Sequence, residues 1–173
     1  MRFGAGLNVV VEDFAVENKD RFCAIRQLIR DLLAMSEGER RAEVTRIQNV
    51  YDKNRAVSPW ETKREWEGLT PVELQTMNLV HNYFSFVDPR DANVGMERAL
   101  VADYEGSHPV FIVDQHNVIG EESKVLADLF YPNVPVRGHL EDSASLIDWR
   151  LAKDLMGFEA QYSMKPYFDQ LAI

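Results

Sequence analysis

The sequence predicts an α/β fold in which parallel strands are flanked by helices, and three observations support this prediction. Residues 20–36 have the apolar spacing of an amphipathic helix, and a short polar link joins them to the β-rich run 43–50. Residues 109–113 are apolar throughout, which is typical of a strand inside a parallel sheet. Because ligands bind at the carboxyl ends of strands in open α/β sheets, residues 49–54 are the first place to expect chemistry.

Composition limits the kind of protein this is. A chain of 173 residues with 46% hydrophobic residues can bury one core, which predicts a single domain over 1–173. The net charge of −9 argues against nucleic acid or an anionic membrane as a main partner. The single cysteine, Cys23, excludes an internal disulfide and suits a reducing compartment. Without a long apolar run or a signal pattern, the sequence predicts a soluble cytoplasmic protein.

Four segments in the first two thirds of the chain carry helix signals. Ser36 and Glu39 are spaced as a capping box, and Thr70 to Glu73 adds a proline at the first helical position. The sequence from Asp88 to Asp91 starts a helix that we expect to run to about residue 103. The apolar stripe expected for the helix over 20–35 is Ile25, Leu28, Ile29, Leu32 and Leu33, and the stripe expected after Asp91 is Ala92, Met96, Ala99 and Leu100.

The remaining segments follow the same rules. Short strands are expected over 83–87 and 145–147, and helices over 121–130 and 148–156, the last closed by Gly157. Residues 52–69 have no clear helical or strand period, which predicts a long surface loop. Residues 4–6, Gly-Ala-Gly, do not fit a dinucleotide-binding turn, because only three residues precede Gly4 and no strand can form there.

Five pieces of the chain resemble a known family in the same order. They are Arg-Ile-Gln-Asn-Val-Tyr at 46–51, Phe-Ser-Phe-Val-Asp-Pro-Arg-Asp at 84–91, Pro-Val-Phe-Ile-Val at 109–113, Val-Arg-Gly at 136–138 and Ala-Lys-Asp-Leu-Met-Gly-Phe-Glu at 152–159. Together they are similar to the C-terminal half of the extended short-chain dehydrogenase/reductases, the NAD-dependent epimerases and dehydratases of nucleotide sugars. The resemblance implies a partial Rossmann-like fold. Residues 12–51 would be a remnant of the Rossmann half, and 52–173 the substrate domain with the last sheet strand.

The resemblance also implies positions for the site. Phe22 and Arg26 fall where the family has its catalytic tyrosine and lysine, and neither can replace that pair, because phenylalanine carries no proton and arginine lacks the compact geometry of lysine. Asn49 and Val50 match cofactor-binding positions, and Asn49 also lies near the substrate. Arg137 matches an arginine that binds a nucleotide phosphate. The alternatives are that Phe22 is a core residue, Arg26 a solvated helix residue and Arg137 a surface ion-pair partner.

Two functions follow from the resemblance. In the first, the chain is a truncated epimerase- or dehydratase-like protein that is catalytically inactive alone and acts by binding or association. In the second, it is a working part of such an enzyme whose dinucleotide-binding half comes from another chain. A third possibility is an unrelated fold that only echoes these motifs. The family implies NAD or NADP as cofactor, but we expect none to bind the chain alone, because the glycine turn is missing.

Partners are predicted from the same reasoning. We expect a homodimer, or a complex with a full-length relative, through the helix over 20–35, because its apolar stripe would lack its usual cover. A nucleotide sugar is a possible ligand. The four histidines, His81, His108, His116 and His139, lack the spacing of a metal site, and we expect no bound metal.

Overall fold

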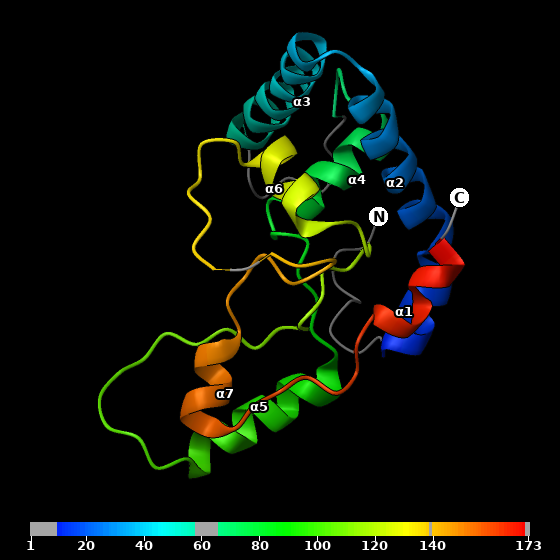
Figure 1. Cartoon of the computed structure of the whole chain (residues 1–173). Coiled ribbons are helices and arrows are strands. Elements are labelled where there is room, and N and C mark those ends of the chain that lie inside the picture. Colours follow the sequence, from blue (N-terminus) through cyan, green and yellow to red (C-terminus); the bar gives the residue numbers. More distant parts are fainter. Residues whose placement is uncertain (1–9, 58–65, 139, 172–173) are drawn as a thin grey trace.

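The structure is a computed structural model that describes residues 10–57, 66–138 and 140–171, and these residues form helices joined by turns and irregular segments (Figure 1). A single residue, Asn18, separates α1 from α2, and the other helices are joined by longer segments. The helices are α1 (Val11–Glu17), α2 (Lys19–Ala34), α3 (Glu37–Val57), α4 (Pro71–Val80), α5 (Pro89–Val101), α6 (Ser123–Phe130), α7 (Arg150–Met156) and the 3-10 helix η2 (Lys165–Leu171).

The predicted α/β fold is wrong, because the described residues contain no strand. Their only β pairing is an isolated antiparallel bridge between His116 and Ala144. In the predicted strand 83–87, Tyr83 and Phe84 lie in a turn, each with φ 52°. Residues 85–87 do lie beside 114–118, since the backbone N–H of Asp114 donates to the carbonyl of Phe86 at 2.7 Å. Neither these segments nor 109–113 and 145–147 add the continuous ladder of hydrogen bonds that makes a sheet.

The segment predicted as the strand 43–50 lies inside the long helix α3. Its buried residues Val44, Ile47 and Tyr51 are spaced by three and four positions, which is the period of a helix rather than of a strand. Ser36 and Glu39 form the expected capping box, with the backbone N–H of Ser36 donating to the Glu39 carboxylate at 3.2 Å. The capping signal therefore marks the beginning of α3 correctly.

Helix α2 provides the centre of the larger hydrophobic core. Its side chains Phe22, Ile25, Ile29 and Leu32 are buried, and the helix packs against α1, α3, α4 and η2. Figure 1 shows α2 between α3 and η2. The expected stripe of α2 is therefore largely covered by the chain itself, although Leu33 is exposed.

A second, smaller cluster lies at the other end of the molecule, where α7 packs on α5 (Figure 1). Gly95 lets Ile112 pack closely on α5, because a Cβ at position 95 would lie 2.9 Å from Cγ2 of Ile112. Gly157 ends α7 in the left-handed conformation with φ 64°, as predicted. The predicted stripe of α5 is only partly right. Ala99 packs against the smaller cluster, but Met96 and Leu100 are exposed, and the buried residues of the helix are Asp91 and Gly95.

The two clusters are joined by residues 158–164, which we call the strap. It leaves α7, runs along α5 and leads into η2 beside α2 (Figure 1). Phe158 and Ala160 pack in the smaller cluster, whereas Met164 is buried in the larger one. The strap therefore adds packing to both clusters.

Candidate functional site

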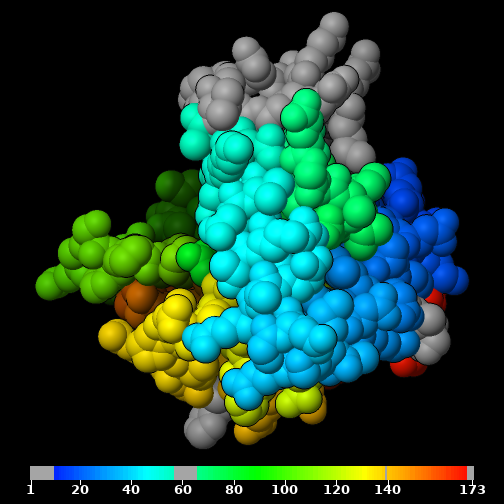
Figure 2. Space-filling view, turned by 90° about the horizontal axis from the view of Figure 1, so that it is seen from above, coloured from blue at the N-terminus to red at the C-terminus, as the bar shows by residue number. Residues whose placement is uncertain are grey.

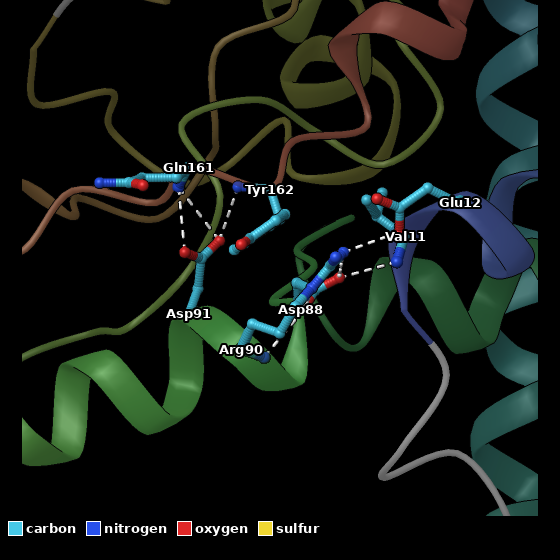
Figure 3. Close-up of polar contacts among 7 residues, drawn as sticks. All are labelled: Val11, Glu12, Asp88, Arg90, Asp91, Gln161 and Tyr162. Carbon is cyan, nitrogen blue, oxygen red and sulfur yellow. Dashed lines mark hydrogen bonds and ion pairs between the residues drawn. The ribbon is translucent and has the colours of Figure 1, made fainter.

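The first turn of α5 forms a polar network that holds a remote part of the chain (Figure 3). Asp88 is fully buried, caps α5, and accepts a hydrogen bond of 2.7 Å from the backbone N–H of Val11 at the start of α1. The Arg90 guanidinium donates to both carboxylate oxygens of Asp88 at 2.9 Å and to Glu12 at 2.7 Å. Burial acts to raise the pKa of Asp88, but the hydrogen bonds from Arg90 and the backbone outweigh it and hold the pKa below its usual value.

The neighbouring carboxylate holds the strap. Asp91 is buried and accepts hydrogen bonds from the backbone N–H groups of Gln161 at 3.0 Å and Tyr162 at 2.9 Å (Figure 3). The guanidinium carbon of Arg90 lies 3.5 Å from the centroid of the Tyr162 ring, a cation–π contact. Asp88, the cap of α5, and Asp91, in its first turn, thus fix segments that are far away in the sequence.

A third buried aspartate binds the next residues of the strap. Asp114 accepts hydrogen bonds from the Ser163 hydroxyl and the Met164 backbone N–H, both at 2.9 Å, and from the backbone N–H of His116 at 3.1 Å. Burial raises the pKa of Asp114, although these hydrogen bonds oppose the rise. Because its oxygens are occupied by the protein, Asp114 has a structural role in this arrangement.

One cavity lies beside the strap. It has a volume of about 440 Å³, which is within the range of small-molecule sites, roughly 300–1,000 Å³. Two of its polar side chains are occupied, since Gln115 donates to the carbonyl of Ala160 at 3.1 Å and Glu159 forms an ion pair with Lys153 at 3.0 Å. The lining residues are Gln115, His116, Glu159, Ala160 and Gln161.

His116 is the titratable group of this cavity with a shifted pKa. Partial burial lowers the pKa of its imidazole, and the charge of Lys165 acts in the same direction. Its Nδ1 lies 3.3 Å from the Ser143 hydroxyl oxygen, while Asp114 is bonded to the His116 backbone and not to the ring. A serine–histidine–aspartate triad needs the carboxylate on one ring nitrogen and the hydroxyl on the other. These three residues are not arranged in that way.

The two positions predicted for catalysis lie one turn apart on α2. Phe22 is fully buried, and its ring centroid lies 5.7 Å from that of Phe14. Arg26 donates from Nε to Glu121 at 2.5 Å and from a terminal nitrogen to the carbonyl of Phe168 at 3.5 Å, so it joins α2 to the segment before α6 and to η2. Both residues have a structural role in this arrangement, and the expectation that neither can replace a catalytic tyrosine–lysine pair stays a prediction.

The predicted binding residues are spread over the molecule. Asn49 is exposed on α3, and Val50 is half-buried on the same helix. Arg137 is exposed in the segment between α6 and α7. No hydrogen bond or ion pair joins any two of these three residues. Because residues 43–50 are helical, Asn49 does not lie at the carboxyl end of a strand, where the ligand was expected.

The described residues contain neither a metal site nor a membrane-spanning helix. Among the residues described here, no three histidine, cysteine, aspartate or glutamate side chains gather in a way that could hold a metal ion. His139 lies outside these residues, as do Gly4 to Gly6. None of the helices in the described ranges is both long enough and apolar enough to cross a bilayer.

The outer side of α5 carries large apolar side chains in contact with solvent. Met96 is 60% exposed, Leu100 87% and Val101 77%, and we call these three residues the α5 face. Tyr104 and Phe111, in the segment that follows, are also exposed. Figure 2 shows the chain after α5, in yellow-green, projecting from the body of the molecule. The sequence prediction missed this surface because it assigned Met96 and Leu100 to the buried stripe.

Comparison of the chain with known protein families, curated proteins and solved structures finds no match in any of the three. The resemblance to the short-chain dehydrogenase/reductases is therefore corrected. That family is built on a parallel sheet, whereas the described residues contain no strand, and its five motif-like pieces lie here on helices and in extended segments. The Rossmann-like half-fold that these motifs predicted is therefore also wrong.

Proposed function

We propose that this chain is a binding protein without catalytic activity and that the α5 face is its contact surface. The observation that carries the proposal is the exposure of Met96, Leu100 and Val101 on one side of one helix. Contiguous apolar patches on soluble proteins mark interaction sites. Burying a large apolar side chain contributes about 1.5–3 kcal/mol, so covering these three would favour association.

The α5 face belongs to a helix that is held firmly. Asp88 and Asp91 anchor its first turn, and Arg98 near its last turn donates a hydrogen bond to the carbonyl of Gly157. On its inner side, Gly95 packs closely against Ile112. A partner would therefore meet a preformed surface and would not need to order it, which lowers the entropic cost of binding.

The cavity beside His116 supports a catalytic function less well. Gln115, Glu159 and Asp114 are each bonded within the protein, and Asp114 bonds to the backbone of His116 and not to its ring. Binding of a nucleotide sugar, and the absence of NAD or NADP binding by the chain alone, stay predictions. Association through the helix over 20–35 also stays a prediction. It was expected because the apolar stripe of this helix would be uncovered, but Ile25, Ile29 and Leu32 are buried by the chain itself.

The proposal is tested with helical peptides that carry a leucine stripe, titrated into the protein by fluorescence anisotropy. We expect saturable binding that Leu100→Glu abolishes. Val16→Glu is the matched control, because Val16 on α1 is also exposed, at 69%. Chemical shifts of the Met96 methyl group should change on binding, while those of the buried Met77 stay fixed. Absence of binding, or binding that survives Leu100→Glu, would refute the proposal.

A further inference from the structure

We infer that the segment bound by the α5 face is an amphipathic helix whose apolar stripe is flanked by lysine or arginine. This inference rests on the proposed function and adds the chemistry of the partner. Its basis is the charge around the face. Glu97 is exposed between Met96 and Leu100 on the same side of α5, and Asp103 and Glu105 are exposed just beyond the end of the helix.

These carboxylates are available for a partner. Within the ranges that the structure describes, no cation forms an ion pair with Glu97, Asp103 or Glu105. The cations of the neighbouring helix α7 are engaged elsewhere, with Arg150 paired to Asp148 and Lys153 paired to Glu159.

The end of α5 adds to the negative potential. The carboxyl end of a helix carries a partial negative charge on its last carbonyl groups, and Leu100 and Val101 lie in that turn. Arg98, the one basic residue of the last turn, donates its hydrogen bond to Gly157 and so turns toward α7. An apolar face next to three carboxylates and a helix carboxyl end fits a partner stripe bordered by positive charge.

A second copy of this chain fits the face less well. The exposed side of α5 runs from Asn93 to Val101, and its midpoint is Glu97. If two copies paired about a two-fold axis through that midpoint, the two Glu97 carboxylates would meet at the axis, where water is excluded. Like charges in that position oppose binding. The net charge of −9 on each chain opposes it further.

The experiment uses two helical peptides with the same leucine stripe, one flanked by lysines and the other by glutamates. For the wild-type chain we expect the lysine peptide to bind at least about fivefold more tightly, the ratio that one modest ion pair provides. Raising the salt concentration should reduce this ratio, because screening weakens exposed ion pairs. Glu97→Lys should reverse the preference while keeping the apolar residues, and Glu122→Lys on the segment before α6 is the control for net charge.

The outcomes separate the inference from the proposed function. A preference for the lysine peptide that Glu97→Lys reverses and Glu122→Lys leaves in place would support the inference. Equal binding of the two peptides, lost in Leu100→Glu, would overturn the inference and leave the binding function standing. Binding of neither peptide would overturn both. Sedimentation that shows a dimer dissociated by Leu100→Glu would overturn the inference in favour of a second copy as the occupant.

Discussion

Asp88 lies at the beginning of two helices, because it caps α5 and its carboxylate also accepts the backbone N–H of Val11, 77 positions earlier, at 2.7 Å. One side chain thus fixes both the first turn of α5 and the entry of α1. The Arg90 guanidinium on the same carboxylate supplies the charge that makes the buried position tolerable.

Replacing Asp88 should therefore cost more than the loss of an ordinary helix cap. We expect Asp88→Ala to lower the free energy of unfolding by about 2–4 kcal/mol, because a cap and a charge-assisted hydrogen bond are lost together. Urea denaturation followed by circular dichroism measures the change. Asp31→Ala on the exposed side of α2 is the control, and an equal effect of both substitutions would contradict a special role for Asp88.

Asp88 should also make stability depend on pH in a defined direction. The pKa of Asp88 in the folded chain is below its usual value of 3.8, so its stabilising contribution is present above pH 3.8 and is lost as pH falls through the folded pKa. The difference in unfolding free energy between the wild type and Asp88→Asn should stay constant near neutral pH and shrink below pH 3.8. A difference that grows on acidification would show that the sign is wrong.

Asp91 should control the attachment of the strap. In Asp91→Ala the backbone N–H groups of Gln161 and Tyr162 lose their acceptor, and we expect their hydrogen exchange to become faster by at least about tenfold, which corresponds to 1.4 kcal/mol. Amides in the centre of α3 serve as the internal control. If the exchange at 161 and 162 does not change, Asp91 does not hold the strap.

His116 should titrate below the usual imidazole range. Because burial lowers the pKa of His116 below 6.5, the folded chain favours the neutral ring, and its contribution to stability is present above pH 6.5 and is lost as pH falls through the folded pKa. NMR of the ring protons measures the midpoint directly. His116→Gln should remove this part of the pH dependence of unfolding. A midpoint above 6.5 would contradict the burial seen here.

Two glycines should respond to alanine in opposite ways. At Gly120 φ is +67°, and a Cβ would lie 2.5 Å from Cγ of Phe168, so Gly120→Ala should destabilise the chain by about 1–3 kcal/mol. Gly38 is in the first turn of α3 with no atom within 4 Å of the added carbon, so Gly38→Ala should stabilise it by up to about 1 kcal/mol. Denaturation midpoints of the two variants, compared with the wild type, test the pair.

Local signals in the sequence predicted several helix ends, although the loop expected over 52–69 begins inside α3, which runs to Val57. The capping boxes at Ser36 and Thr70, the helix start at Asp88 and the left-handed glycine at 157 are all present, because each depends on residues within four positions of one another. The phase of a helix is harder to predict. In α5, Leu100 and Met96 are as apolar as core residues, yet the side that faces inward carries Asp91, Gly95 and Ala99.

The strand over 43–50 could not be excluded by composition alone. Val44, Val50 and Tyr51 favour a strand by propensity, but Ile47 completes a helical spacing with Val44 and Tyr51, and the helix buries all three together. The partners of Asp88, Asp91 and Asp114 were also beyond reach. Each carboxylate accepts a hydrogen bond from the backbone of a distant segment. Every residue except proline has a backbone N–H, so the sequence does not indicate which one is the donor.

The position of the strap near the end of the chain also determines the order in which the two clusters can fold during synthesis. During synthesis α5 and α7 emerge before residues 161–164, so at that stage the carboxylates of Asp91 and Asp114 have none of their strap donors. Until those residues arrive, water must solvate both groups, and the two clusters cannot yet close over them. Released chains that end at residue 157 should therefore be cut by protease near Asp114, whereas chains that extend through η2 should resist.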